Sequence, residues 1–159
     1  MFREVARKNR ALPREECISL LKSETRGVLS VLGDGGYPYG MPMNHYYNEE
    51  DGCLYFHCGR QKSHRNDALR ACGKVSFCVH DAGVREDGNW AYTVRSVIVF
   101  GRMEILDDWD TIVRFSTLLS RKFTQDEQYI REEIQKSGPA TLLLRLTPEH
   151  ITGKWVVEL

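Results

Sequence analysis

Alternating runs of strand-forming residues and turn signals constrain this chain most, and they fill its central part. The turn signals are rich in glycine or acidic residues, as in Gly33–Gly36 and Asn48–Gly52. Strands joined by such short turns pair antiparallel. The predicted strands are Gly27–Leu32, Pro38–Tyr47, Cys53–Cys58, Lys74–His80, Tyr92–Leu106 (with Gly101 as a candidate bulge), Ala140–Leu146 and Ile151–Val157.

Four helical segments are predicted beside these strands. The first has a proline near its start and acidic residues in its first turn, and the third repeats apolar residues close to a helical period. The segments are Pro13–Ser23, Ser63–Cys72, Trp109–Phe123 and Glu127–Lys136. Together the pattern predicts a mainly β fold (β with inserted α), an antiparallel six- to seven-stranded split β-barrel with flanking helices.

Length, charge and cysteine content exclude several classes of protein. The 159 residues suit one domain spanning 1–159. The 22 basic residues balance the 22 acidic ones, which argues against nucleic acid or an anionic membrane as the main partner. No apolar run approaches the ~18 residues of a membrane span, and the charged N-terminus does not resemble a signal peptide. Five cysteines without a CxxC pair argue against disulfides and structural zinc, so a cytoplasmic location is expected.

The segment Tyr55–Leu69 carries the strongest functional signal. An apolar strand runs into a basic turn that opens a helix, and the polar residues of this turn are Arg60, Lys62, Ser63, His64 and Arg65. A helix N-terminus presents free N–H groups and a dipole that favours an anion, and arginine forms forked hydrogen bonds to phosphate oxygens. The segment therefore predicts a phosphate-binding site.

The order of motifs extends this prediction to a family. The motifs are PYGMPMNHYY, LYFHC, KSHR, NDALR, KVSFCV and RSVIVFG. From about residue 27 to residue 101, this order resembles the FMN-binding split barrel of the pyridoxamine 5′-phosphate oxidase superfamily, and most of all its NimA-like (nitroimidazole-resistance) branch.

The resemblance assigns the phosphate segment residue by residue. The family pattern is a small residue, any residue, lysine, three residues, then leucine or isoleucine. Here it reads Ser63, His64, Arg65 and, after three residues, Leu69. Arg65 therefore stands where the family usually has lysine. Either Arg60 or Lys62 is the second cation, because the preceding turn is a residue longer than usual.

The resemblance also implies flavin contacts on the neighbouring strands. The matched residues are Met43, Asn44, His45 and Tyr46 along the isoalloxazine edge, His57 and Cys58 beside the ribityl chain and phosphate, and Ser96 on an adjacent strand. In the family two subunits share each flavin site, so a homodimer with the flavin at the subunit interface is implied.

Structural alternatives remain for several of these residues. His57 is either a core histidine bonded to a carbonyl or a cofactor contact. His45 and Tyr46 are alternatively a cross-strand surface pair, and Ser96 alternatively serves only strand geometry. The apolar stripe of Trp109–Phe123 is interpreted as packing.

The resemblance implies an FMN-dependent oxidoreductase that reduces a small electrophilic substrate, such as a nitroimidazole-type nitro group. A nicotinamide or another reductant would supply the electrons, and His45 or His57 the proton. No metal ligand set is predicted. The alternatives are a haem- or deazaflavin-binding split barrel and a non-enzymatic flavin-binding protein.

Overall fold

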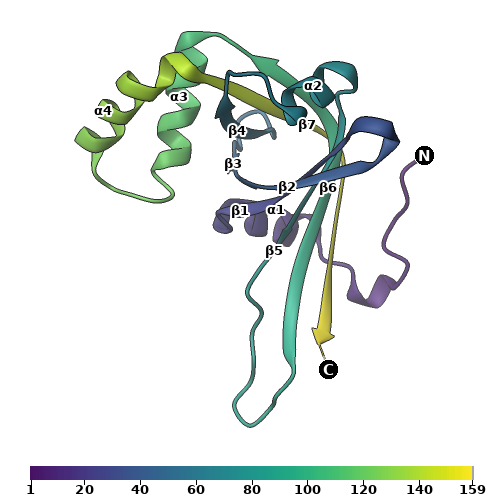
Figure 1. Ribbon diagram of the computed structural model, residues 1–159. Helices are drawn as coiled ribbons and strands as arrows, with labels where there is room; N and C mark the ends of the chain where they lie inside the picture. The colour runs from purple at the N-terminus through teal and green to yellow at the C-terminus, as the bar shows by residue number, and fades with distance from the viewer. Residues whose placement is uncertain (159) are drawn as a thin grey trace.

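A seven-stranded antiparallel sheet curls into a half-barrel in the computed structural model, which describes residues 1–158 (Figure 1). The strands are β1 Arg26–Leu32, β2 Pro38–Asn44, β3 Tyr46–Tyr47, β4 Leu54–Gly59, β5 Lys74–His80, β6 Tyr92–Leu106 and β7 Thr141–Glu158. Their order in the sheet is β2-β1-β5-β6-β7-β4-β3. The predicted mainly β fold with six to seven antiparallel strands and flanking helices is confirmed.

The four predicted helices are also confirmed. They are α1 Arg14–Ser23, α2 His64–Ala71, α3 Trp109–Ser120 and α4 Glu127–Ser137, with 3-10 turns at Lys8–Arg10, Asp34–Gly36 and Gly138–Ala140. Side-chain caps explain three of the starts, because Ser63, Asp108 and Asp126 each accept a hydrogen bond from the backbone N–H three residues later. Helices α3 and α4 lie side by side at one end of the sheet (Figure 1).

Two apolar clusters hold these elements together. The larger one lies inside the curl of the sheet and includes the fully buried Leu29, Phe56 and Phe77. The smaller one lies under α3, where the rings of Tyr55 and Phe115 stack with centroids 3.5 Å apart. Successive side chains on a strand point to opposite faces, so β4 contributes to both clusters.

Two strand predictions need correction. The segment Pro38–Tyr47 is not one strand: β2 ends at Asn44, and β3 pairs with β4 instead of β1. The chain therefore passes at His45 from one end of the sheet to the other. The C-terminal region, predicted as two strands, is the single strand β7.

A bulge explains the second correction. Gly101 lies opposite Pro148 and Phe100 lies opposite His150, so Glu149 is an extra residue in β7. A bulge tolerates a proline, which has no N–H to donate to the sheet. The predicted irregularity at Gly101 is confirmed, although the extra residue belongs to the partner strand.

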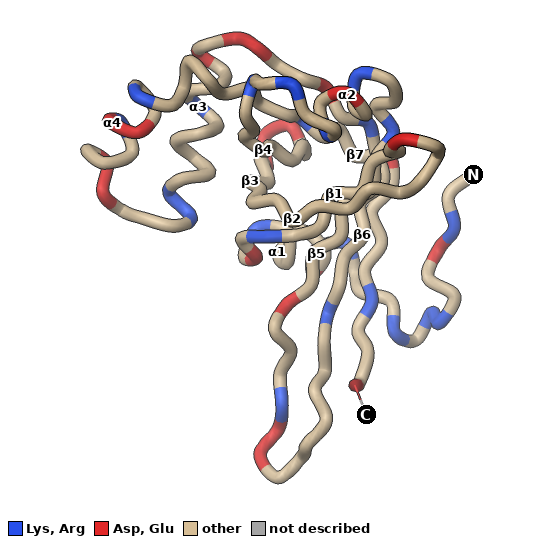
Figure 2. The backbone as a smooth tube through the Cα atoms, viewed as in Figure 1, with Lys and Arg blue, Asp and Glu red and all other residues tan. Residues whose placement is uncertain are grey.

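Charges of both signs are interspersed along the backbone (Figure 2). None of the helices within residues 1–158 combines the length and the hydropathy that a membrane-spanning helix requires.

The bulge yields a stability prediction. A Cβ atom on Gly101 would overlap the Thr147 carbonyl oxygen, which is backbone and has little freedom to move. We expect Gly101→Ala to lower the free energy of unfolding by about 1–3 kcal/mol, as overpacking does. Gly40→Ala is the matched control, because its Cβ would meet only side chains at 3.4 Å or more. Urea unfolding measures both, and equal losses would show that the bulge does not require glycine.

Candidate functional site

Three of the predicted flavin contacts line one depression of about 370 Å³. They are Met43 and Asn44 at the end of β2 and His57 on β4, joined by Arg26 and Pro42. Arg26 lies directly opposite Asn44 in the β1–β2 register, and its Nε donates a hydrogen bond of 2.9 Å to Asn44 Oδ1. The Asn44 side chain is therefore held in place at the edge of the depression.

The predicted phosphate segment borders the same depression through Arg65. This residue lies in the first turn of α2, and its Nη1 is 3.9 Å from Met43 Sδ. Its Nε donates to Asn66 Oδ1 at 3.2 Å, and the buried Asn66 donates in turn to the Gly59 and Gln61 carbonyls. Among the ion pairs of residues 1–158, none includes Arg65. Its charge is therefore available to a ligand.

The structure also distinguishes the two candidates for the second cation. Arg60 forms a forked ion pair with Asp107, and it donates further to the carbonyl oxygens of Pro139 at 3.1 Å and Thr141 at 3.2 Å. Its guanidinium is therefore committed to protein groups. Lys62 is exposed just before α2, which leaves it as the candidate. The Ser63 hydroxyl caps α2 by accepting from the Asn66 N–H.

His57 lies at the surface of the depression and not in the core. Its side chain is solvent-accessible in the single chain, although enough protein atoms surround it that desolvation lowers its pKa below the ordinary value. At neutral pH the imidazole is therefore uncharged. His57 also lines a second depression, of about 280 Å³, beneath α3 and α4.

His45 and Cys58, in contrast, direct their side chains into the core. His45 is fully buried and its Nε2 lies 2.8 Å from the Leu21 carbonyl oxygen. Burial, followed by the nearby charge of Lys122, lowers the pKa of His45 to about 4. Cys58 is buried with Sγ 3.9 Å from Asn66 Oδ1, and burial raises its pKa. In the single chain both side chains therefore face away from the depression, and His45 is a core histidine bonded to a carbonyl, the alternative that the sequence left open for His57.

Tyr46 and Ser96 lie away from the depression in the single chain. Tyr46 faces the α3 side, with its ring centroid 6.4 Å from that of Phe115. Ser96 lies on the outward face of the sheet, where it lines a hollow of about 210 Å³ with the N-terminal segment. Of the predicted residues, the structure therefore groups Met43, Asn44 and His57 with Arg65, and Lys62 and Ser63 next to them.

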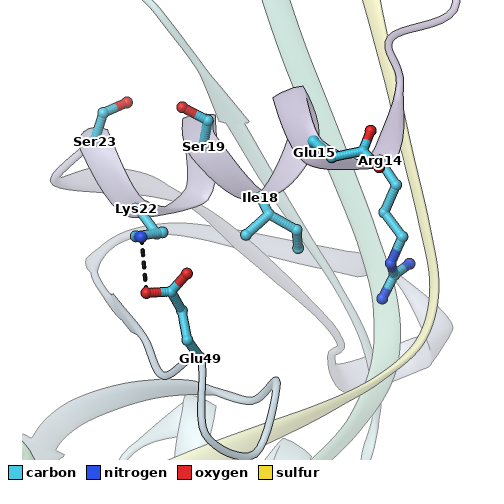
Figure 3. A pocket seen from close by; sticks show the side chains of 7 residues that line it. All are labelled: Arg14, Glu15, Ile18, Ser19, Lys22, Ser23 and Glu49. Carbon is cyan, nitrogen blue, oxygen red and sulfur yellow. Dashed lines mark ion pairs between the residues drawn. The ribbon is translucent and has the colours of Figure 1, made fainter.

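A separate depression of about 630 Å³ lies over the exposed face of α1 (Figure 3). Its side chains come from α1 and from Glu49, which forms an ion pair of 2.8 Å with Lys22. Apart from Ile18, these side chains are polar or charged. It contains none of the residues predicted from the sequence, so we do not assign it to the site.

A model of the family described as pyridoxamine 5′-phosphate oxidase matches residues 13–155. The chain belongs to that family. Among curated proteins, none matches this sequence.

Several solved structures share the fold of this chain. A candidate 5-nitroimidazole antibiotic resistance protein from Bacteroides thetaiotaomicron has 18% identity and a TM-score of 0.73, covering 92% of this chain and 87% of its own. A FAD-binding protein from Mesorhizobium loti has 23% identity and a TM-score of 0.63, with coverages of 92% and 97%. The flavocytochrome Anf3 of Azotobacter vinelandii has 20% identity and a TM-score of 0.75, with coverages of 94% and 71%. At these identities the likeness establishes the shared fold.

Sequence reasoning missed two contributors to the surface around His57. Arg26 could have been found, because the Gly33–Gly36 turn sets the β1–β2 register and so places Arg26 opposite Asn44. Ser116 gave no signal, because it lies within the apolar stripe of α3 that was interpreted as packing.

The burial of His45 predicts a specific pH dependence. In the unfolded chain a histidine takes up a proton near its ordinary pKa of 6.5, whereas folded His45 resists protonation down to about 4. Stability should therefore fall as the pH drops through this window, by about 2 kcal/mol between pH 7 and pH 5.

The control for this prediction is His45→Gln, which keeps an N–H donor for the Leu21 carbonyl but does not titrate. Urea unfolding of both proteins at several pH values isolates the contribution of His45. If the difference between them does not change with pH, folded His45 takes up its proton at the same pH as in the unfolded chain, and burial does not lower its pKa.

Proposed function

We propose that this protein is a flavin-dependent oxidoreductase that binds FMN over the depression formed by Met43, Asn44 and His57, with the FMN phosphate at the start of α2. Its substrate is a small electrophile, such as the nitro group of a nitroimidazole-type compound. A nicotinamide or another small reductant supplies the electrons.

The position of Arg65 is the observation that carries this proposal. Its guanidinium reaches from the first turn of α2 to Met43, and so joins an anion-binding helix start to a depression with apolar and amide side chains. FMN needs these features together, because it combines a dianionic phosphate with a flat ring that has a polar edge. The placement of a FAD-binding protein among the structural relatives supports a flavin.

Each residue then has a definite task. Arg65, Lys62 and the first N–H groups of α2 hold the phosphate. Met43 packs against the ring, and Asn44, held by Arg26, presents its amide to the polar edge of the ring. Neutral His57 donates a hydrogen bond toward the reacting end. A bound flavin supplies the hydride transfer itself.

A homodimer forms part of the proposal. The outward face of the sheet carries the exposed apolar side chains of Val28, Leu32 and Phe100, at 44%, 50% and 38% exposure. Cys78 and Ile98 continue this face, since Val28 pairs with Cys78 and Cys78 with Ile98 in the strand register. A second copy docked here would cover these side chains. Ser96 lies on the same face and would then sit near the interface.

The structural likeness to a flavocytochrome keeps haem as a second candidate cofactor. A Soret band after haem addition, without flavin uptake, would favour it, and uptake of a deazaflavin alone would favour that cofactor. Tight flavin binding without NAD(P)H turnover would indicate a non-enzymatic flavin-binding protein.

The five cysteines are all free thiols, which supports a reducing, cytoplasmic location.

Flavin binding should depend on Arg65 through the phosphate. We expect Arg65→Ala to weaken FMN binding by about tenfold to a hundredfold, the range for a lost charge-assisted hydrogen bond. Riboflavin has no phosphate, so its affinity should not change. Arg65→Lys should restore most of the FMN affinity, because it supplies the cation that is usual in the family.

The matched control is Arg70→Ala, which removes a cation from the last turn of the same helix. Flavin fluorescence titration measures all the affinities, and mass spectrometry of the retained cofactor distinguishes FMN from FAD. An equal loss of FMN and riboflavin affinity in Arg65→Ala would contradict the phosphate assignment.

The dimer face yields a second test. Val28→Glu replaces a side chain that is 44% exposed in the single chain, so the subunit itself should fold normally. We expect this variant to shift the protein from dimer to monomer in analytical ultracentrifugation, because the charge would be buried at the interface. Val84→Glu, at an exposed position in the loop between β5 and β6, should leave the dimer intact. A Val28→Glu protein that stays dimeric would place the interface elsewhere.

A further inference from the structure

The second depression beside His57 lies under the helical pair α3–α4 and has no role in the flavin site described above. It has a volume of about 280 Å³, and its lining includes His57, Ser116, Ser120, Glu133, Ile134 and Ser137. Because His57 also lines the proposed flavin depression, the two hollows are neighbours that meet at one imidazole.

The packing of α3 explains why hydroxyl groups gather there. Phe115 stacks on Tyr55 of β4, which fixes α3 over that face of the strand. His57 follows Tyr55 by two residues and so points to the same face. Ser116 and Ser120 are four residues apart on α3 and lie on one side of the helix. The stacked pair therefore sets both serines over the segment of β4 that carries His57.

The buried hydroxyl of Ser116 is the main evidence that this hollow binds a ligand. Its side chain is only 8% exposed, and its Oγ has no hydrogen-bond partner within the described residues. A buried hydroxyl without a partner is costly and rare in native proteins. Thr141 Oγ1, by contrast, donates to the Ser137 carbonyl at 2.9 Å and is already satisfied. Among the hydroxyl groups that line the hollow, the one of Ser116 is thus buried and still without a partner.

The charges of the side chains that line the hollow restrict the class of ligand that it can bind. Among the described residues that line the hollow, the carboxylate of Glu133 is the only ionised side chain, and neither lysine nor arginine is present. His57 adds no positive charge at neutral pH, because desolvation lowers its pKa. Glu133 pairs with Lys136 at 3.6 Å, but this lysine is 77% exposed and does not line the hollow, so an anion inside would meet a carboxylate and no cation of the lining. Ile134 offers an apolar contact, and the volume suits a single ring with small substituents.

We infer that this hollow is the substrate subsite of the proposed flavin enzyme, and that Ser116 donates a hydrogen bond to the acceptor group of a neutral single-ring electrophile. The inference rests on the proposed function, because it takes the neighbouring depression as the flavin site. Ser116 thereby selects a neutral acceptor such as a nitro group over a carboxylate of the same shape.

The test uses flavin-free protein and a matched pair of ligands. The probe is 2-methyl-5-nitroimidazole, and its anionic counterpart is 2-methylimidazole-4-carboxylate, in which a carboxylate replaces the nitro group. In a ¹⁵N NMR titration, we expect the nitro compound to shift the amide signals of Ser116, Ser120 and Ile134. The carboxylate should bind at least about tenfold more weakly.

Ser116→Ala supplies the decisive variant. It should weaken nitro-compound binding by about three- to tenfold, as expected for one lost hydrogen bond. It should also raise the Tm of the ligand-free protein by about 1–3 °C, because it removes a buried hydroxyl without a partner. Ser19→Ala, on the exposed side of α1, is the control and should change neither quantity.

Three results would overturn the inference: equal affinities for the two ligands, unchanged affinity in Ser116→Ala, or signal shifts confined to Met43 and Asn44. Failure of the flavin assignment is seen separately, in the FMN and riboflavin titrations. Arg65→Ala should lose FMN affinity and keep binding of the nitro compound, so the two sites are tested independently.

Discussion

The closure of the sheet at His45 is the constraint on which the rest of the structure depends. Strands β2 and β3 lie at opposite ends of the sheet order but are separated in the chain by this single residue. Its imidazole contacts the Leu21 carbonyl at the end of α1, and Lys122 donates to the carbonyl oxygens of both His45 and Glu24. Burial lowers the pKa of Lys122 to about 8, so the ammonium remains mostly charged at neutral pH. The buried ring of His45 and the ammonium of Lys122 thus connect α1, the strand break and the segment after α3.

This closure determines which side chains reach the candidate site. Met43 and Asn44 precede the break and line the depression proposed for the flavin, whereas Tyr46 follows it and faces α3. The same division runs along β4, where Phe56 and Cys58 face the core and Tyr55 and His57 face the helical pair. His57 is the residue at which the two surfaces meet, because it is close to the end of β2 and to α3. A substrate held beneath α3 would therefore lie next to a ring bound over Met43.

The sequence was sufficient for the elements whose signals are local. Strands β5 and β6 have the predicted bounds. The helical segments predicted to begin at Ser63 and Trp109 begin there in the structure, capped by Ser63 and Asp108. The sequence was insufficient where the direction of a side chain depends on pairing with a distant strand. The break at His45 carries no turn residue, and Pro148 is tolerated within β7 only because of the bulge opposite Gly101. Among the candidate site residues, the basic turn predicts Arg65 as the ligand-binding cation. Pairing with distant strands decides that the side chains of His45 and Cys58 face inward.

The basic turn before α2 also shows why a count of cations does not define a phosphate site. Arg60 is bound to Asp107, just before α3, and to the Pro139 and Thr141 carbonyls, just after α4. A single guanidinium therefore anchors both ends of the helical pair to the end of β4, which frees Arg65 for a ligand. Beyond this anchor α4 packs mainly on α3, and Ile130 is its only buried residue among those described. Segments with so few buried contacts open at low free-energy cost. The wall of the proposed subsite that carries Glu133 and Ile134 is thus better able to adjust to a ligand than the opposite wall, where His57 and Ser116 stay fixed by the sheet and by the Tyr55–Phe115 stack.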